Sequence, residues 1–229
     1  MKTLGLIGGT GWVSTVDYYR LINQEVNKRM GGLNAGKILL HSFNYADINA
    51  LNKKNNLDSV YEMVENAAQD IIGIGADGIV LCANTLHKFA DRLQKEITKP
   101  IIHIAEAAAE KIKNKSMNKV GLLGTKYTME WDFYKTRLSN KGITALVPET
   151  EDRQFIHDTI FNELLIEVFK KESKERILRI MDDLKSQGAE GIVLGCTELP
   201  LVIKANDTDL PIINTLEIHA KAAVDFALS

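Results

Sequence analysis

The stretch Gly-Ala-Asp-Gly-Ile-Val-Leu at residues 75–81 is the clearest indication of the fold, because it occurs twice in this chain. It returns as Gly-Ala-Glu-Gly-Ile-Val-Leu at residues 188–194, displaced by 113 positions. In each copy a glycine-containing turn leads into a short run of branched apolar residues, which is typical of a buried strand. A repeat of this length predicts two similar halves within one chain.

Two more blocks return in the same order at nearly the same displacement. Leu-Gly-Leu-Ile-Gly at 4–8 returns as Val-Gly-Leu-Leu-Gly at 120–124, and Lys-Pro-Ile-Ile at 99–102 returns as Leu-Pro-Ile-Ile at 210–213. Three blocks in one order indicate two related lobes. We expect lobe 1 to span residues 1–103, completed by 214–229, and lobe 2 to span 104–213.

Short apolar runs alternate with amphipathic segments along the whole chain, and this alternation predicts parallel strands with helices on both faces of a sheet. The expected fold is α/β, with two pseudo-twofold-related lobes, each a parallel four-stranded sheet flanked by helices, and an active site in the cleft between them. Strands are expected at 3–7, 37–42, 78–82, 100–104, 119–124, 143–147, 191–195 and 211–214. Helices are expected near 14–29, 57–73, 85–96, 105–115, 128–140, 151–170, 173–187 and 215–227.

Composition narrows the class of protein. The chain has 229 residues, of which 45% are hydrophobic and 25% charged, with a net charge of −2. These values are ordinary for a globular protein and give no support to a nucleic-acid or membrane-surface partner. No apolar run is long enough to cross a bilayer, and the first residues lack the pattern of a signal peptide, so we expect a cytoplasmic location.

The sequence favours neither a metal nor an organic cofactor. Its two cysteines lie 114 positions apart, without the close pairing of a disulfide framework or a structural zinc site. The loop Gly-Gly-Thr-Gly at 8–11 departs from the spacing of a dinucleotide-binding loop, and the second expected strand is not followed by an acid that would bind a ribose.

In open parallel sheets, ligands bind beyond the carboxyl ends of the strands. Four such ends carry small or polar residues: Gly-Gly-Thr-Gly at 8–11, Ala-Asn-Thr at 83–85, Thr-Lys-Tyr-Thr at 125–128 and Cys-Thr-Glu at 196–198. Loops of this kind suit a carboxylate or a phosphate. Cys196 has two interpretations here: a small residue that fills a tight strand end, or a reactive thiol whose thiolate is favoured by a helix N-terminus.

These motifs together resemble the aspartate/glutamate racemase family, whose members racemise amino acids without pyridoxal phosphate. The resemblance runs from Met1 to the last helix. It rests on the opening Gly-Gly loop, Asn84-Thr85 with His87, Leu-Gly-Thr at 123–125 with Thr128, and Gly-Cys-Thr-Glu at 195–198. The segments Leu-Leu-His-Ser at 39–42 and Tyr-Thr-Met-Glu at 127–130 are most similar to the broad-specificity amino-acid racemase branch.

The resemblance implies a mechanism in which two cysteines flank the α-carbon of an amino-acid substrate. One thiolate removes the α-proton, and the other thiol delivers a proton to the opposite face. It assigns acid–base catalysis to Cys196, implies that no cofactor is needed, and implies a homodimer. The substrate-binding residues that it implies are Gly9, Thr10, Asn84, Thr85, Thr125, Thr128, Thr197 and Glu198.

The chain departs from the family pattern at the first cysteine. The family places a cysteine directly before the Asn-Thr pair, but here Ala83 occupies that position and Cys82 lies one residue earlier. The internal repeat agrees, because a displacement of 113 pairs Cys196 with Ala83. A shift of one residue turns a strand side chain to the opposite face, so we expect Cys82 to pack in the lobe unless a bulge re-aims it.

The missing thiol leaves three functions open. In the first, another group or water supplies the second proton, and the protein is a slow or one-sided racemase. In the second, the protein is a one-cysteine lyase or decarboxylase. In the third, it binds an amino acid without turning it over. His87 fits a supporting role better than that of a base, and the role of His157 stays undecided. Glu198 either orients groups around Cys196 or caps a helix, and a carboxylate there would raise the pKa of the thiol.

The residues expected to recognise the substrate side chain point away from a dedicated aspartate site. Aspartate-selective members of the family carry an arginine and a lysine at positions that align here with Ile48 and Leu165. Their loss favours a smaller or less charged side chain. We interpret Lys53, Lys54 and Arg153 as surface charges. They would replace the missing arginine and lysine only if the loops differ from those of the aspartate-selective members.

Overall fold

The computed structural model describes residues 1–229. Contacts between residues divide the chain into two compact units, which are described separately. Unit 1 comprises Met1–His103 and His219–Ser229, and unit 2 comprises Ile104–Ile218. Residues 214–218, which the sequence led us to place with lobe 1, group with unit 2 in this division.

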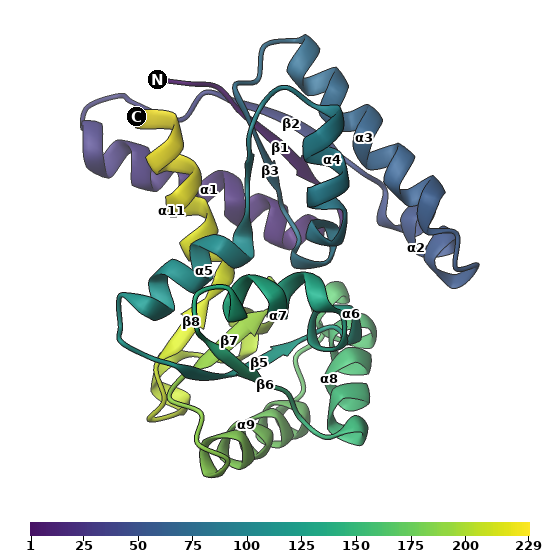
Figure 1. Cartoon of the computed structure of the whole chain (residues 1–229), viewed down its shortest axis with the longest axis vertical. Helices are drawn as coiled ribbons and strands as arrows, with labels where there is room; N and C mark the ends of the chain where they lie inside the picture. Colours follow the sequence, from purple (N-terminus) through teal and green to yellow (C-terminus); the bar gives the residue numbers. More distant parts are fainter. The chain divides into compact units, whose positions relative to one another are not determined.

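Unit 1 contains a sheet of four parallel strands (Figure 1). The strands lie in the order β2-β1-β3-β4, and β1 pairs with both β2 and β3. The carboxyl ends of all four strands therefore lie at one edge of the sheet. The strand bounds are β1 Leu4–Gly8, β2 Ile38–Ser42, β3 Gly78–Leu81 and β4 Ile101–Ile102.

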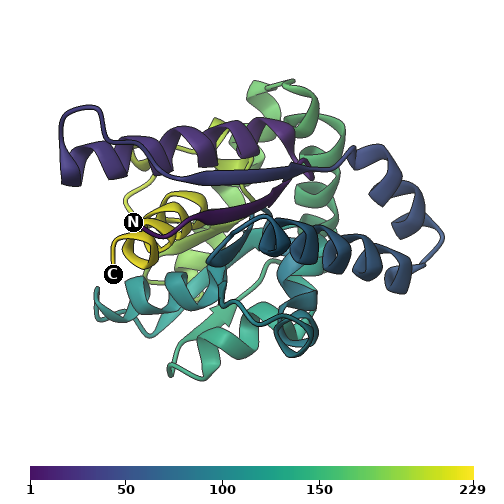
Figure 2. The same cartoon turned by 90° about the horizontal axis from the view of Figure 1, so that it is seen from above.

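Helices cover both faces of this sheet. A Cβ added at Gly8 would meet Thr15 of α1, and one added at Gly78 would meet Phe226 of α11, so these two helices lie on one face. Figure 2 shows α1 running alongside β2. The helices and 3₁₀ turn are α1 Trp12–Met30, α2 Tyr45–Lys53, α3 Leu57–Gly73, η1 Asn84–Phe89, α4 Ala90–Glu96 and α11 Thr215–Leu228.

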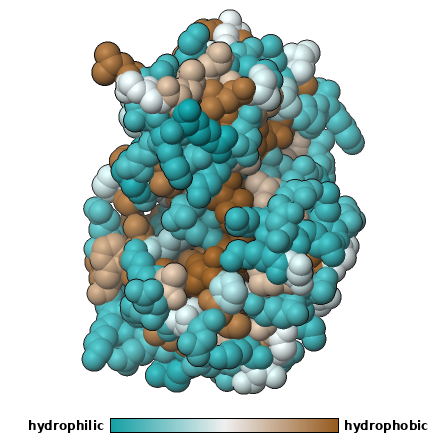
Figure 3. All heavy atoms as spheres, turned by 90° about the vertical axis from the view of Figure 1, so that its left-hand side faces the viewer, coloured by the Kyte–Doolittle hydropathy of each residue, from teal (hydrophilic) through white to brown (hydrophobic).

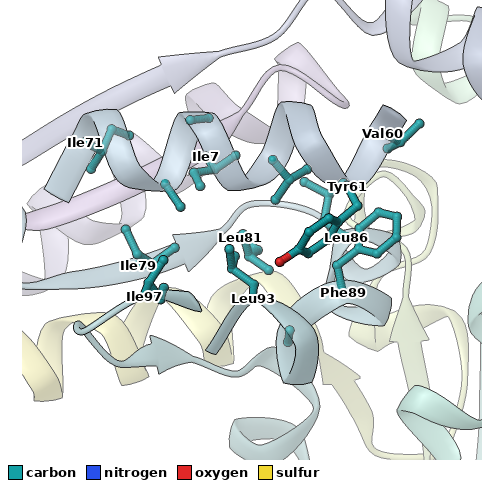
Figure 4. Packing of buried hydrophobic residues seen from close by; sticks show 14 of the residues in the cluster. Ile7, Val60, Tyr61, Ile71, Ile79, Leu81, Leu86, Phe89, Leu93 and Ile97 are labelled. Atoms are coloured by element: carbon teal, nitrogen blue, oxygen red, sulfur yellow. The ribbon is translucent and has the colours of Figure 1, made fainter. Parts of the chain in front are cut away.

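The opposite face of the sheet carries the main core of unit 1, formed with α3 and α4 (Figure 4). Ile7 of β1 and Ile79 of β3 pack there against Ile71 of α3 and Leu93 of α4. The α3 helix presents a buried residue every third or fourth position, which is the spacing that places one apolar stripe on the sheet.

Unit 2 repeats this arrangement with the strand order β6-β5-β7-β8, all parallel. One face packs against α8 and α9, and the other against α5 and α7. The strands are β5 Lys119–Gly124, β6 Thr144–Leu146, β7 Ile192–Gly195 and β8 Ile212–Asn214. The helices and 3₁₀ turns are α5 Ile104–Lys113, α6 Lys126–Glu130, α7 Asp132–Ser139, α8 Thr150–Asn162, η2 Leu164–Ile166, α9 Lys171–Ser186, α10 Leu199–Val202 and η3 Ala205–Asp207.

The repeated glycines of the sequence explain how closely the helices approach the two sheets. A Cβ at Gly5 would lie 2.3 Å from Cγ2 of Ile71 in α3. At the corresponding Gly121 it would lie 2.9 Å from Cδ1 of Leu184 in α9. Only a residue without a side chain allows either helix to pack this closely on its central strand. The fold class expected from the sequence is thus confirmed, with eight strands in two parallel sheets.

Two expected helices are wrong in their extent. The segment 128–140 is broken at Trp131, whose extended backbone separates α6 from α7, and Asp132 then starts α7 with the acidic residue that a helix N-terminus favours. The segment 151–170 ends at Asn162, because the carbonyl of Glu163 accepts hydrogen bonds from Ile166 and Val168 in a tight turn. The short helix α2 was not anticipated at all.

The surface matches the balanced charge of the sequence. Hydrophilic residues cover most of the face shown in Figure 3, and hydrophobic ones appear among them as separate patches. None of the helices is both long enough and apolar enough to cross a membrane.

Equivalent core residues of the two units provide a test of the repeat. Ile79 and Ile192 occupy matching positions in β3 and β7 and are fully buried. We expect Ile79→Ala and Ile192→Ala each to lower the free energy of unfolding by about 2–5 kcal/mol, through lost burial and the cavity left behind. Urea denaturation measures this loss. Ile74→Ala is the control, because Ile74 is exposed; a loss as large at Ile74 would contradict the prediction.

Candidate functional site

The chemistry-bearing residues of unit 2 follow two neighbouring strands. Gly124 ends β5 and Gly195 ends β7, and these two glycines are paired in the sheet. A Cβ on Gly124 would lie 2.8 Å from the carbonyl oxygen of Gly195, so the strand ends approach too closely for a side chain. Thr125 and Cys196 come directly after this pair. The two motifs that the sequence singled out are therefore brought to one edge of one sheet.

Thr125 and Thr128 form a buried hydroxyl pair at the start of α6. The Thr125 side chain caps the helix by accepting a hydrogen bond from the Thr128 amide at 3.4 Å, and the two hydroxyl oxygens lie 3.4 Å apart. Both residues are buried. The arrangement fixes two hydroxyl groups at the strand end, where they are suited to an anionic group.

Cys196 lies in a hydrogen-bonded cluster with the two residues that follow it. Its thiol donates to Oε2 of Glu198 at 3.0 Å, and the Thr197 hydroxyl donates to the same oxygen at 2.9 Å. All three side chains are buried. Of the two roles considered for Glu198, the contacts favour orienting the groups around Cys196.

The environment favours the neutral thiol over the thiolate. Burial raises the pKa of Cys196 well above its ordinary value, and the charge and hydrogen bond of Glu198 raise it further. The backbone amides of Glu198 and Leu199 act in the opposite direction but are weaker. The amides at the turn thus favour the thiolate, as a helix N-terminus would, but burial and Glu198 outweigh them, as expected for a carboxylate beside the thiol.

Glu198 has an acceptor to spare. Its Oε1 is buried and makes no hydrogen bond, whereas Oε2 accepts two. A buried carboxylate oxygen without a donor is costly, so this atom is available to a ligand group that donates a hydrogen bond.

Other polar residues of unit 2 stabilise the surrounding helices. Nδ1 of His157 accepts a hydrogen bond from the Lys126 amide at 3.3 Å, which caps α6 from α8. Arg153 binds Glu130 at 3.0 Å and the Pro148 carbonyl at 2.9 Å. These contacts give His157 and Arg153 structural partners. Leu165 packs against the apolar core of the unit.

Unit 1 places Ala83 where unit 2 places Cys196. Ala83 is extended and packs against the same core cluster as Ile79 and Leu81, four and two residues earlier. Cys196 belongs in the same way to the cluster that contains Ile192 and Leu194. The alternation of the two strands thus aligns Ala83 with Cys196. Asn84 and Thr85 follow Ala83 as the first residues of the turn η1.

Cys82 is withdrawn from any such role. It is fully buried, and its thiol lies 3.6 Å from the Val80 carbonyl oxygen. Its amide donates to Ile7 in the neighbouring strand, so the ladder continues without a bulge. Burial strongly raises the pKa of this thiol. Cys82 is a core residue in this structure.

The first loop is held tightly. Gly9 has φ +82°, and a Cβ there would lie 2.2 Å from the Phe43 carbonyl oxygen. Its amide is engaged by Thr15 Oγ1 at 2.9 Å, and is not open to a ligand as the loop composition suggested. The Thr10 hydroxyl oxygen is buried and without a hydrogen-bond partner.

The remaining candidates of unit 1 lie away from these strand ends or are engaged. Ile48 is buried in the core, and Lys53 and Lys54 are exposed at the end of α2. Nδ1 of His87 lies 3.0 Å from the Ala83 carbonyl oxygen, in contact with two further buried histidines, His103 and His219, that sequence reasoning missed. His103 directly follows β4, whereas the sequence placed it inside the strand expected at 100–104.

The pairing of Cys196 with Glu198 predicts how fast the thiol reacts. In a Cys82→Ser background, we expect iodoacetamide to alkylate Cys196 slowly at pH 8, because the neutral thiol is favoured. Glu198→Gln removes the negative charge, so the pKa of Cys196 should fall and the rate at pH 8 should rise, by about tenfold for each unit of the fall.

Mass spectrometry of the alkylated peptide measures this rate. Glu163→Gln is the matched control, since Glu163 is a second buried carboxylate of unit 2 with an unpartnered oxygen. A rate that is unchanged or lower in Glu198→Gln would show that Glu198 does not control the thiol.

Comparison with known proteins places these features in a family. The family model for Asp/Glu/hydantoin racemases matches residues 7–223. The chain is 22% identical to the glutamate racemase of Persephonella marina, over 85% of this chain and 77% of that one. It is 24% identical to the broad-specificity amino-acid racemase RacX of Bacillus subtilis, over 75% of this chain and 74% of that one.

Solved structures give the same result over the full length. A candidate Asp/Glu racemase from Yersinia pestis is 42% identical with a TM-score of 0.93, and the match covers 100% of both chains. An aspartate racemase homologue from Pyrococcus horikoshii is 34% identical with a TM-score of 0.85, again over 100% of both chains. The chain therefore belongs to the Asp/Glu/hydantoin racemase family and is an isomerase of the racemase type.

Proposed function

We propose that this chain is a pyridoxal-phosphate-independent amino-acid racemase in which Cys196 carries proton transfer on one face of the substrate and no cysteine serves the other. The observation that carries the proposal is the buried thiol–carboxylate pair at the end of β7, with 3.0 Å between Sγ of Cys196 and Oε2 of Glu198. The family match supports it.

Glu198 makes the thiol usable as a base. The thiol proton passes to Oε2 of Glu198, which leaves a thiolate and a neutral carboxylic acid. The thiolate then removes the α-proton of the substrate and becomes a thiol again, while the substrate becomes a carbanion. Because the protein favours the neutral thiol before the substrate arrives, the reactive thiolate forms only when a positive group enters the site. The ammonium of an amino acid is such a group when it lies beside the sulfur, because an ion pair with Glu198 itself would keep the carboxylate ionised and the proton on the thiol. Oε1 of Glu198, which becomes the carbonyl oxygen of the neutral acid, is proposed to accept a hydrogen bond from the substrate.

The opposite face depends on Ala83. A methyl group in place of a thiol carries no proton but leaves room for a water molecule. We propose that water protonates the carbanion on this face. A water molecule is a poorer acid–base group than a positioned thiol, so the proposed racemase is slow or one-sided.

Hydroxyl and amide groups are proposed to bind the substrate carboxylate and to stabilise the charge of the carbanion. In unit 2 these are Thr125, Thr128 and Thr197, whose hydroxyls lie at the strand ends. In unit 1 we assign the same role to Thr10, Asn84 and Thr85, on the strength of the family motifs they occupy. Gly9 is proposed only to shape the loop beside them, because its amide is engaged by Thr15.

The proposed substrate is a small or acidic amino acid. Relatives of the chain include glutamate racemases, an aspartate racemase homologue and a broad-specificity amino-acid racemase. Ile48 and Leu165 supply no charge for a side-chain carboxylate, since both pack in apolar clusters. This favours a smaller or less charged side chain within that range.

Proton exchange in deuterated water tests the proposed function. We expect L- and D-amino acids, including aspartate, glutamate and homoserine, to exchange their α-proton in the presence of the protein, and Cys196→Ser to abolish the exchange. Ala83→Cys restores the second thiol, so it should raise the rate of inversion by about tenfold or more, the gain expected of a positioned acid–base group. NMR follows the exchange and chiral chromatography follows the inversion.

The possible outcomes separate the rival functions. Exchange with full retention of configuration would favour a one-cysteine enzyme, and release of carbon dioxide from a malonate-like acid would identify it as a decarboxylase. Binding of amino acids without any exchange, in the wild type and in Ala83→Cys alike, would contradict the racemase proposal and leave an amino-acid-binding protein. The cytoplasmic location stays a prediction.

We also propose that the chain forms a homodimer through α1. Trp12, Val16 and Tyr19 lie along one ridge of this helix and are exposed by 58%, 58% and 56%. Tryptophan and tyrosine are the residues most enriched at the centres of interfaces. Beside the ridge, Asp17 and Arg20 form an ion pair at 2.8 Å, so a second antiparallel α1 would meet both charges with complementary ones.

A charge on this ridge should separate the two chains. We expect size-exclusion chromatography with light scattering to give the mass of two chains for the wild type and of one chain for Val16→Glu, because a buried unpaired carboxylate opposes association. Ile74→Glu is the control at another exposed apolar position of unit 1. A wild-type mass of one chain at micromolar concentrations would contradict the proposed dimer.

A further inference from the structure

Three buried histidines form one cluster in unit 1. The ring of His87 lies 4.7 Å from that of His103 and 5.4 Å from that of His219, measured between centroids, and both contacts are edge-on. All three side chains are buried. They come from three distant segments, namely η1, the end of β4 and α11. The proposed reaction uses none of them as a base, and they form no arrangement that could hold a metal ion.

The cluster coincides with the places where the chain passes between the units. The chain leaves unit 1 after His103 and returns to it at His219. We call these two places the crossings. His103 flanks the first crossing and His219 the second, and the ring of His87 contacts both of these histidines. A group that links both crossings is placed to control how freely they move.

Hydrogen bonds join the crossings directly. Nε2 of His219 lies 2.6 Å from the carbonyl oxygen of Ile102, the residue before His103. Because a carbonyl oxygen only accepts, Nε2 carries the proton and donates it. Nδ1 of the same ring then accepts from the Tyr18 hydroxyl at 2.8 Å. The neutral ring satisfies both partners, and it ties α11 to the end of β4 and to α1.

His87 extends the cluster to a candidate site residue. Its Nδ1 donates to the Ala83 carbonyl oxygen at 3.0 Å, by the same reasoning about donor and acceptor. Ala83 occupies the position of the absent cysteine and precedes Asn84. The conformation of this strand end therefore depends on the histidine that contacts both crossings.

The surroundings of the cluster oppose a positive charge. Burial lowers the pKa of His87 well below its ordinary value, and the neighbouring rings of His103 and His219 lower it further, against the carbonyls of Ala83 and Ile102. Burial also lowers the pKa of His219 to about 4. Tyr18 from α1, the neighbouring imidazoles and these carbonyls contact the rings, and none of these groups carries a negative charge.

We propose that the cluster of His87, His103 and His219 is an acid-released clamp on the two crossings. With neutral rings it holds the crossings together and fixes Ala83; with protonated rings it opens and frees both crossings and the strand end. This proposal does not depend on the racemase reaction.

The pH at which the clamp opens follows from the direction of the shifts. An opened, solvated histidine titrates near pH 6.5. Because the pKa values of His87 and His219 are lowered in the closed form, the open form binds more protons as the pH falls below about 6.5, and the closed form loses stability until about pH 4. Each ring then increases opening by up to about tenfold per pH unit, and two rings by up to about 100-fold.

Hydrogen exchange of the full chain between pH 8 and pH 5 tests the clamp. The readout is the protection of peptides covering 100–107 and 214–222, expressed relative to an unstructured peptide at the same pH. We expect protection to be constant above pH 7 and to fall by more than tenfold per pH unit below about pH 6. His219→Ala should lose protection at every pH.

Two variants separate the clamp from a purely structural role. His219→Gln keeps a donor for the Ile102 carbonyl but cannot be protonated. It should therefore restore protection at neutral pH, and the slope of the logarithm of protection against pH should be half that of the wild type. His41→Ala changes a histidine of unit 1 outside the cluster and should behave as the wild type. Protection that does not depend on pH, or that falls equally in His219→Gln, would overturn the proposal, as would imidazole NMR spectra showing protonated His87 and His219 at pH 7.

Discussion

The two-residue period of a buried parallel strand determines which side chains of this protein face the core and which stand beside the family motifs. In β3 and β7 it assigns alternate residues to opposite faces of each sheet, and so it determines which side chain stands at the end of the strand. Ala83 and Cys196 fall on equivalent faces, and Cys82 falls on the other. A displacement of one residue along the strand thus places Cys82 on the other face of the sheet from the position of Ala83, which is equivalent to Cys196. The chain has two cysteines, and only Cys196 lies where we propose that a thiol acts.

The remaining cysteine is governed by a balance between burial and its neighbours. A thiol beside a carboxylate in a buried place is kept neutral, although the amides of the following turn favour the thiolate. In the proposed reaction, this neutral thiol becomes a thiolate only when a ligand changes the local charge. Thr197 contributes by holding Oε2 of Glu198, which keeps the carboxylate oriented toward the sulfur.

Much of this was predictable because it follows from spacing. The repeated glycine-led strands predicted two parallel sheets, which the structure contains. The displacement of 113 between the repeats aligned Ala83 with Cys196 from the sequence alone. The break at Trp131 was not predictable, since apolar periodicity continues through it while the backbone changes direction. For the Cys196 thiol, the sequence predicted that Glu198 would raise the pKa, but not the larger effect of burial. That effect depends on how completely the strand end is buried, which no local pattern encodes.

The histidine cluster shows why long-range contacts escape sequence reasoning. His87, His103 and His219 are ordinary within their own segments, and no motif links them. Their association depends on α11 returning to the first sheet, a choice of connection that the repeat leaves open. His103 had no local signal either, because the sequence placed it within the strand expected at 100–104, whereas β4 ends at Ile102.

The return of α11 has a consequence for how the protein is made. Unit 2 is continuous in sequence, whereas unit 1 lacks its last helix until residues 219–229 have been added. A ribosome releases a chain from its N-terminus onward, so the inserted unit is fully synthesised while the unit that began first is still incomplete. The amide of Lys2 binds the carbonyl of Ala227, and this bond joins the segment before β1 to the end of α11. The part of the first sheet that α11 covers therefore stays exposed until the whole of unit 2 has been made.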